Sequence, residues 1–207
     1  MKSIKLLFQG DSLTDGDRDR SDIHNLGESY PKYAATILRE KYPDAKFEFI
    51  NLGIGGDRTD SLLERVDGDF VDVGADIISI LVGVNDVWNR YDLKIPNTDE
   101  VIEANYRALL EKIKQGTNAK IMLIQPYTVG YAQAYIREEM LRVHAIVKRL
   151  ADEYADAYLP IDDCFWSRDE APEYFTRDGV HPTENGARFM AEHYVECISP
   201  LIDSILN

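Results

Sequence analysis

The feature that most constrains the fold is an alternation between short apolar runs and longer amphipathic segments. The short runs are compact and rich in β-branched or aromatic residues, as expected for strands covered on both faces. They are Ile4–Gln9, Phe47–Leu52, Ile77–Val82, Ile121–Gln125 and, more weakly, Ala157–Ile161. Between them, apolar residues recur at helical spacing over Tyr30–Lys41, Arg58–Val66, Thr98–Lys114, Tyr131–Tyr154 and Thr183–Leu206. This order predicts an α/β fold, a three-layer doubly wound domain with a five-stranded parallel sheet.

Two local expectations accompany this pattern. Thr98 and Thr183 precede helical segments and are expected to cap them. Pro200 lies inside the final segment and should break or kink that helix. No repeat, low-complexity stretch or Pro/Gly/Ser-rich linker divides the chain, so one domain covering residues 1–207 is expected.

The charge balance limits the classes of partner. The chain carries 37 acidic and 23 basic side chains, a formal net charge of −14. Such a surface repels phosphate backbones and anionic headgroups, so neither nucleic acid nor a membrane is expected as a partner. A small neutral substrate remains compatible with this charge.

The N-terminus and the cysteines indicate the compartment. The apolar part of the N-terminus is too short for a signal-peptide core, and no apolar run is long enough to span a bilayer. A cytoplasmic protein is therefore expected. Cys164 and Cys197 are expected to be buried free thiols. Neither has a His or Cys at ligand spacing, so no metal and no cofactor is expected.

Polar clusters occur at the ends of the predicted strands. Gly10-Asp11-Ser12-Leu13 follows the first strand, Gly53-Ile54-Gly55-Gly56-Asp57 the second, and Gly83-Val84-Asn85-Asp86 the third. After the last strand comes Asp178-Gly179-Val180-His181-Pro182, just before the final helix. Because ligands bind at the carboxyl ends of parallel strands in open α/β sheets, these clusters should meet at one edge.

These residue types match the needs of acyl transfer. Ser12 can act as the nucleophile, with His181 as its base and Asp178 orienting the imidazole. The tetrahedral oxyanion needs donors in place, and the backbone N–H groups of Ser12 and Gly56 and the amide of Asn85 can supply them. Gly56 also leaves room for an acyl group to approach closely.

Each cluster has a structural explanation when it is taken alone. Gly-Asp-Ser is a common turn triplet, a lone His is usually a surface or core residue, and Asn85 is compatible with capping a turn. The glycines after the second strand resemble a dinucleotide loop, but Arg58 stands where the third glycine of that fingerprint should fall. Asp11 is expected to be structural. The convergence of the clusters on one edge favours catalysis over these separate explanations.

Together the clusters resemble the SGNH subgroup of the GDSL esterase/lipase family, named for the residues matched here by Ser12, Gly56, Asn85 and His181. The resemblance covers nearly the whole chain. It implies a flavodoxin-like α/β/α sandwich with a five-stranded parallel sheet. It also places the catalytic aspartate three residues before the histidine, at Asp178, and it is compatible with a homo-oligomer.

A closer likeness lies in the run Gly83–Asp92, which is similar to the third block of intracellular bacterial acetyl-xylooligosaccharide esterases. That likeness implies a small-molecule ester substrate, an acetylated saccharide. Those enzymes can carry a large residue just before or within the Asp-x-x-His turn, whereas this chain has Arg177 before Asp178 and Gly179 after it.

Three aromatic residues bear on the substrate. Trp88, Tyr91 and Trp166 are candidate substrate-binding residues, because an aromatic face suits stacking against a pyranose ring. The alternative is that Trp88 and Trp166 are core residues. The loop Thr14–Gly27 is strongly charged, which argues against a channel for long acyl chains.

The sequence therefore predicts a serine ester hydrolase that removes O-acetyl groups from short oligosaccharides through an acyl-enzyme. A lysophospholipase or thioesterase of the same family is the alternative enzyme. A non-catalytic glycan-binding module is the alternative of another class. The remaining histidines, His24, His144 and His193, are given no catalytic role.

Overall fold

Five parallel strands form the centre of the molecule. The structure is a computed structural model, and it describes residues 2–130 and 134–207. The strands are β1 (Ser3–Gly10), β2 (Lys46–Asn51), β3 (Ile77–Leu81), β4 (Lys120–Ile124) and β5 (Ala157–Leu159). They pair in the order β2-β1-β3-β4-β5, and every pairing is parallel. This is the flavodoxin-like strand order, as expected.

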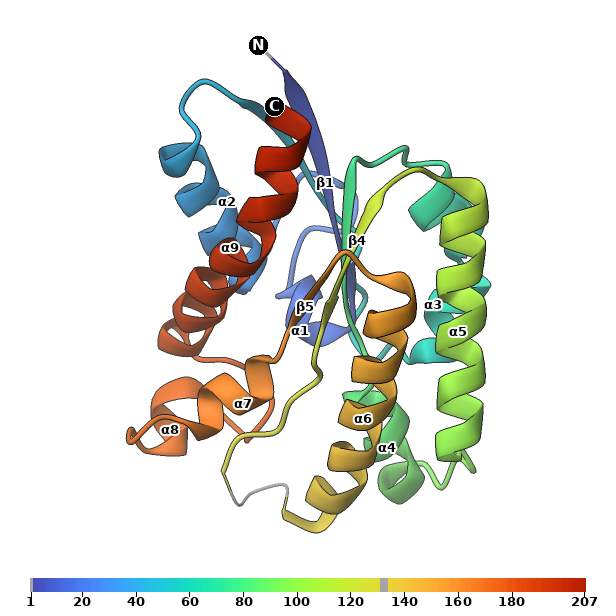
Figure 1. The fold of residues 1–207 in the computed structure, drawn as a ribbon. Coiled ribbons are helices and arrows are strands. Elements are labelled where there is room, and N and C mark those ends of the chain that lie inside the picture. Colours follow the sequence, from blue (N-terminus) through green and yellow to red (C-terminus); the bar gives the residue numbers. More distant parts are fainter. Residues whose placement is uncertain (1, 131–133) are drawn as a thin grey trace.

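Helices cover both faces of the sheet (Figure 1). On one face lie α2 (Tyr30–Lys41) and α9 (Glu184–Leu206), packed against each other. On the other lie α3 (Thr59–Glu64), α5 (Asp99–Gly116) and α6 (Arg137–Tyr154). The predicted three-layer α/β/α architecture is confirmed. All five residues of β3 are buried, because this strand is central and covered on both sides.

Both predicted caps are present. The Thr98 hydroxyl accepts the Val101 N–H at 3.4 Å at the start of α5. The Thr183 hydroxyl accepts the Gly186 N–H at 3.1 Å at the start of α9. Each cap satisfies one of the N–H groups that the first helical turn leaves without an internal partner.

Two helix expectations need correction. The segment predicted to be helical from residue 131 forms α6 only from Arg137, after a short 3₁₀ turn, η2 (Ala134–Ile136), and residues 131–133 lie outside the described residues. The helix begins where Glu138 and Glu139 occupy its first turn, a favourable place for acidic side chains. The final helix α9 continues through Pro200 without a break. Pro200 and Glu196, whose carbonyl loses its usual donor, are both exposed.

Several short elements were not predicted. These are α1 (Ser12–Asp15), α4 (Val84–Asp92), α7 (Ile161–Trp166), α8 (Pro172–Phe175) and the π turn η1 (Asp67–Val71). The helix α7 begins at Ile161, a residue predicted to end β5. The helices α1, α4 and α7 follow strands directly and start at the carboxyl edge of the sheet. Their short, polar sequences carry too few apolar repeats for a helical period to be detected.

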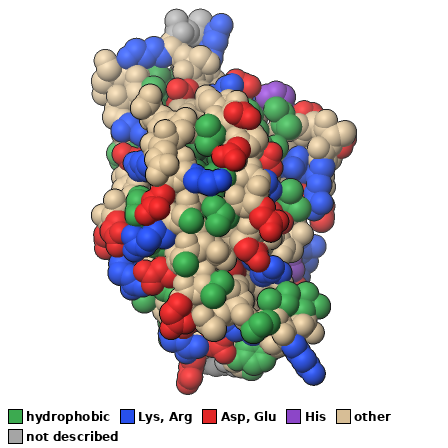
Figure 2. Space-filling view, turned by 90° about the vertical axis from the view of Figure 1, so that its right-hand side faces the viewer, with side chains coloured by type: hydrophobic (Ala, Val, Ile, Leu, Met, Phe, Trp, Pro, Cys, Tyr) green, Lys and Arg blue, Asp and Glu red, His purple; other side chains and the backbone are tan. Residues whose placement is uncertain are grey.

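The net negative charge is not gathered into one field on the face that carries α5. Figure 2 shows acidic and basic side chains interspersed there, with small apolar areas between them. Glu103, for example, pairs with both Arg107 and Arg149. Among the helices described, none is long and apolar enough to cross a membrane.

Candidate active site

Ser12 is the first residue of α1, directly after β1. Its neighbour Asp11 caps this short helix, since Asp11 Oδ1 accepts the Leu13 N–H at 3.0 Å. Gly10 has a φ of +153°, and a Cβ at that position would lie 2.2 Å from the carbonyl oxygen of Leu81 on the adjacent strand. Gly10 thus allows the chain to leave the sheet against β3, and Asp11 has the structural contact expected of it.

His181 and Asp178 lie on the turn between α8 and α9. The Nε2 atom of His181 is 3.0 Å from Ser12 Oγ, although the two residues are 169 positions apart. The Nδ1 atom of His181 is 2.7 Å from Asp178 Oδ2. The other carboxylate oxygen, Oδ1, accepts the backbone N–H groups of His181 at 2.8 Å and Val180 at 3.0 Å. One carboxylate therefore holds both the imidazole and the backbone of the turn.

This turn is tied to its surroundings by backbone hydrogen bonds. The Arg177 N–H donates to the His181 carbonyl at 2.8 Å, and the Val129 N–H, after β4, donates to the Gly179 carbonyl at 2.7 Å. Partial burial disfavours the ionised form of Asp178, but hydrogen bonds from His181 and Val180 outweigh it and hold the pKa of Asp178 below its ordinary value. Asp178 is therefore a stable anion beside the imidazole.

Gly56 and Asn85 follow β2 and β3 at the same edge of the sheet. Gly56 has a φ of +90°, and a side chain there would meet no atom within 4 Å. Within the described residues, the N–H groups of Ser12 and Gly56 have no hydrogen-bond acceptor. One N–H of the Asn85 amide donates to the Asp57 carbonyl at 3.0 Å, which fixes the amide and leaves its second N–H. The site thus holds three donors of the kind an oxyanion needs.

Two buried carboxylates lie beside these donors. Burial raises the pKa of Asp11 to about 7, with Asp86 and Asp57 adding to the shift against the hydrogen bond from Leu13. Burial also raises the pKa of Asp86 to about 6, although hydrogen bonds from Thr59 and Asn97 oppose it. The sequence could not predict these contacts of Asp86, because Thr59 and Asn97 come from other segments of the chain.

A small cavity lies over the nucleophile. Its volume is about 100 Å³. Its lining is Ser12, Gly16, Asp17, Glu28, Ser29, Arg177, His181 and Pro182. Charged side chains contribute to its walls: Gly16 and Asp17 belong to the charged loop Thr14–Gly27, and Glu28 directly follows that loop. Arg177 also lines an adjoining cavity of about 250 Å³.

The three aromatic candidates differ in their surroundings. Trp88 is half-buried and packs against the hydrophobic core, which favours its structural alternative. Tyr91 and Trp166 are exposed. The Tyr91 hydroxyl donates to Glu139, and the Trp166 indole N–H donates to the Thr128 carbonyl at 3.0 Å.

The other histidines and the cysteines lie outside this constellation. His24 Nδ1 is 3.0 Å from the Phe49 carbonyl, His144 is buried near Asp162, and His193 packs on Phe189. Both cysteines are free, as expected, but they are half-buried rather than buried. Within the part of the chain that the structure describes, no group of His, Cys, Asp or Glu is arranged to hold a metal ion.

A hydroxyl, an imidazole and a carboxylate in hydrogen-bonded series, at the carboxyl edge of a flavodoxin-like sheet, define the class of serine ester hydrolases. The comparison with protein families agrees with this class. Residues 8–189 match the GDSL-like Lipase/Acylhydrolase family, so the chain belongs to that family and is a carboxylic ester hydrolase.

Known proteins extend this comparison. An acetylxylan esterase of Geobacillus stearothermophilus is 30% identical over 201 residues, covering 92% of each chain. Its crystal structure has a TM-score of 0.85 at 29% identity and covers 93% of each chain. An alpha/beta hydrolase from the metagenome of Lake Arreo, Spain, at 22% identity and a TM-score of 0.85, shares the fold over 93% of this chain and 94% of its own. Solved catalytic mutants of the Geobacillus esterase replace a serine, an aspartate and a histidine.

Proposed function

We propose that this protein removes O-acetyl groups from short acetylated oligosaccharides, foremost xylooligosaccharides, with Ser12, His181 and Asp178 as its catalytic triad. The observation that carries the proposal is the short series from Ser12 Oγ to His181 Nε2 and from His181 Nδ1 to Asp178 Oδ2, opening into a small polar cavity. The choice of an acetylated saccharide as the substrate rests on the similarity to the Geobacillus acetylxylan esterase.

The reaction proceeds in two acyl-transfer steps. Ser12 Oγ attacks the acetyl carbonyl carbon while His181 Nε2 takes the hydroxyl proton, and the tetrahedral oxyanion is held by the N–H groups of Ser12 and Gly56 and the Asn85 amide. The C–O bond to the sugar breaks as His181 returns the proton to the sugar oxygen. Water then attacks the acetyl-serine ester while His181 Nε2 takes its proton; the bond between the acetyl carbon and Ser12 Oγ breaks as His181 returns that proton to Oγ, and acetate leaves.

The cavity over Ser12 supports a small acyl group. Its volume of about 100 Å³ is too small for a long alkyl chain, and charged side chains of Asp17, Glu28 and Arg177 line it. A lysophospholipase or a long-chain thioesterase needs room for such a chain. The alternative of a non-catalytic glycan-binding module is disfavoured for another reason, since it would have no need for a serine held 3.0 Å from a carboxylate-bound imidazole.

Exposed aromatic side chains support binding of the sugar. Trp166 and Tyr91 are 41% and 43% exposed and belong to α7 and α4, which follow β5 and β3 at the carboxyl edge. Aromatic faces stack on the apolar C–H patches of pyranose rings. A cytoplasmic location, a single domain and assembly into a homo-oligomer remain predictions from the sequence.

Four measurements test the function together. The Ser12→Ala variant should lose p-nitrophenyl acetate hydrolysis while its circular dichroism is unchanged, and the wild type should be labelled at Ser12 by a fluorophosphonate. Acetate release should be faster from acetylated xylooligosaccharides than from manno- or glucosaccharides. Faster turnover of octanoyl than acetyl esters would contradict the deacetylase assignment, and full activity of Ser12→Ala would contradict the triad.

A further inference from the structure

Asp86 is a fully buried carboxylate that directly follows Asn85 in the first turn of α4. Its oxygens accept hydrogen bonds from two other segments. Oδ1 accepts the Thr59 hydroxyl at 2.7 Å and the Asn97 amide at 2.8 Å, and Oδ2 accepts the Thr59 N–H at 3.1 Å. Because a buried carboxylate is costly without such donors, these bonds form a fixed link between the three segments.

The first of these segments is the loop that carries Gly56. Thr59, the first residue of α3, is fully buried and stands three positions after Gly56. The same loop is held a second time, since the Asn85 amide donates to the Asp57 carbonyl at 3.0 Å. Neighbouring residues of α4 thus fasten the loop at Asp57 and Thr59, which limits how Gly56 and Asn85 can move relative to each other.

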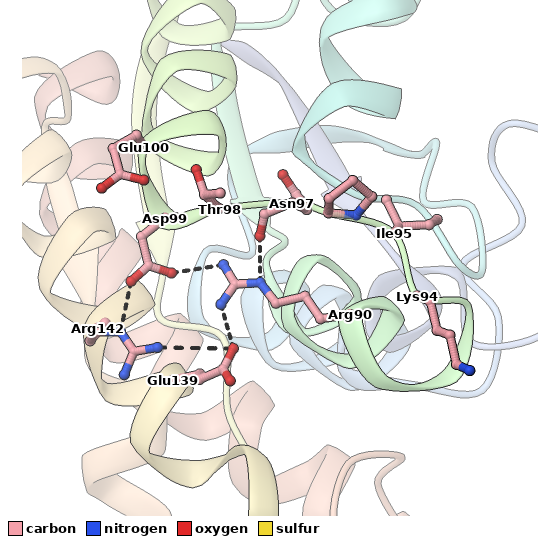
Figure 3. Close-up of a pocket in the computed structure, with 10 residues that line it drawn as sticks. Arg90, Lys94, Ile95, Asn97, Thr98, Asp99, Glu100, Glu139 and Arg142 are labelled. Carbon is pink, nitrogen blue, oxygen red and sulfur yellow. Dashed lines mark hydrogen bonds and ion pairs between the residues drawn. The ribbon is translucent and has the colours of Figure 1, made fainter.

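The second segment is the loop before α5, shown in Figure 3. While the Asn97 amide reaches Asp86, the Asn97 carbonyl accepts from Arg90 Nε on α4. The Arg90 guanidinium also pairs with Asp99 at 2.7 Å and with Glu139 on α6. Asn97 is therefore held at its carbonyl by Arg90 and at its side-chain amide by Asp86. Because its backbone is fixed in this way, the amide that donates to Asp86 is fixed too.

An open cavity of about 490 Å³ lies between α4, the loop before α5 and α6, and these contacts form part of its wall. Four of its charged side chains are paired with one another: Arg90 with Asp99 and Glu139, and Arg142 with Asp99 (Figure 3). Such a network braces α4 against α5 and α6. The ion pairs in the cavity wall therefore hold α4 in place, and the first turn of α4 carries Asn85.

We propose that Asp86 is the positioning residue of the oxyanion hole, which sets the Gly56 loop and the Asn85 amide at a fixed separation through its hydrogen bonds to Thr59 and Asn97. The proposal rests on the proposed function, which makes Gly56 and Asn85 oxyanion donors. Donors lower the barrier only if they stand in place before the charge develops, and a displacement of about 1 Å can cost about 10²-fold in rate.

The main variant is Asp86→Asn, which keeps the volume but turns an NH₂ group toward the donors of Thr59 and Asn97. With p-nitrophenyl acetate we expect kcat to fall about 10- to 100-fold, with KM within about threefold of the wild type. The inhibition constant of a small alkylboronic acid should rise in parallel with the loss of kcat, because its tetrahedral adduct with Ser12 uses the same donors.

A matched pair of variants separates positioning from stability. Thr59→Val and Ser79→Ala each remove one buried hydroxyl; Ser79 lies in the middle of β3 and bonds Leu7 and Tyr194. Both should lower the melting temperature, but only Thr59→Val should lower kcat and weaken boronate binding. The conservative Thr59→Ser keeps the hydroxyl and should restore kcat to near the wild-type value.

The comparison of Thr59→Val with Ser79→Ala also keeps the proposal testable if the Asp86→Asn variant does not fold. Wild-type kcat and boronate affinity in a folded Asp86→Asn variant, or equal kcat in Thr59→Val and Ser79→Ala, would overturn the positioning role. In either case fluorophosphonate labelling of the wild type and the inactivity of Ser12→Ala would still support the triad. An unlabelled, Ser12-independent wild type would instead contradict the proposed function itself.

Discussion

Asp178 Oδ2 lies 2.7 Å from His181 Nδ1, and both side chains are partly open to solvent, with exposed fractions of 45% and 38%. Water can compete for this contact, so the orientation of the imidazole depends strongly on the turn that Asp178 also binds through the Val180 and His181 N–H groups. The pair is therefore held as much by the backbone hydrogen bonds of the turn as by the contact between the two side chains.

This relationship predicts different losses for two substitutions of Asp178. Asp178→Asn keeps an acceptor for the turn but favours the wrong imidazole tautomer, so kcat should fall about 10²- to 10⁴-fold. Asp178→Ala also releases the turn and should lose at least as much kcat, with a lower melting temperature. Steady-state kinetics and thermal melting check both variants. An Asp178→Asn variant with wild-type kcat would show that Asp178 does not orient the base.

The Asn85 amide should contribute to the transition state rather than to substrate binding. Asn85→Ala removes one oxyanion donor, and kcat should fall about 10²- to 10³-fold while KM changes little. Asn89→Ala, on the same helix and also half-buried, is the matched control and should retain activity. Equal kcat values in the two variants, measured with p-nitrophenyl acetate, would remove Asn85 from the oxyanion hole.

The sequence predicted the layers of the fold and the meeting of distant clusters, because both follow from general rules. Buried parallel strands are recognisable as apolar runs, and the carboxyl-edge rule alone brings Ser12 toward His181. The link from Asp86 to Thr59 and Asn97 could not be predicted in this way. The partners of Asp86 depend on how the loops pack, and no local periodicity or motif in the sequence predicts that packing.

The same limit applies to side chains with two plausible environments. Trp88 follows the Asn-Asp block and was compatible with either a sugar contact or the core, and the structure packs it against the core. The start of α6 and the continuation of α9 through Pro200 were missed because both depend on exposure and on tertiary contacts. Local propensity describes such contacts poorly.

Arg177 should affect the sugar more than the acetyl group. It lines both the cavity over Ser12 and the adjoining cavity of about 250 Å³. We expect Arg177→Ala to raise KM for acetylated xylooligosaccharides several-fold and to leave p-nitrophenyl acetate kinetics within about twofold. Arg188→Ala, an exposed arginine on α9, is the control.

Equal effects of Arg177→Ala on both substrates would contradict a role in sugar recognition. The position is informative because a solved variant of the Geobacillus esterase changes a tryptophan directly before the aspartate of its catalytic mutants. In this chain the residue directly before Asp178 is Arg177, so the wall of the site carries a flexible cation rather than an indole. The Arg177→Trp variant therefore tests whether the proposed preference for xylooligosaccharides depends on that wall.

Asp11 should make stability depend on pH in a predictable direction. It is fully buried, Oδ1 caps Leu13, and Oδ2 has no described partner. Since burial raises the pKa of Asp11 to about 7 from an ordinary 3.8, the protonated form is the one the fold favours. This contribution to stability is fully present below the unfolded pKa and is lost as the pH rises through about 7.

The Asp11→Asn variant keeps the capping oxygen and cannot ionise, so it avoids that loss. Its free energy of unfolding relative to the wild type should increase by about 2.7 kcal/mol between pH 5 and pH 7, because the wild type loses about 1.4 kcal/mol for each pH unit below the raised pKa of about 7, and the difference should level off between pH 7 and pH 8. Asp11→Ala is also neutral but loses the cap, so its curve should run parallel and lie about 1 kcal/mol lower. Urea denaturation of the three proteins at pH 5, 6, 7 and 8 measures the differences, in which the other carboxylates largely cancel. A difference between Asp11→Asn and the wild type that stays constant with pH would show that Asp11 is ionised throughout, and the buried anion would then need a donor on Oδ2.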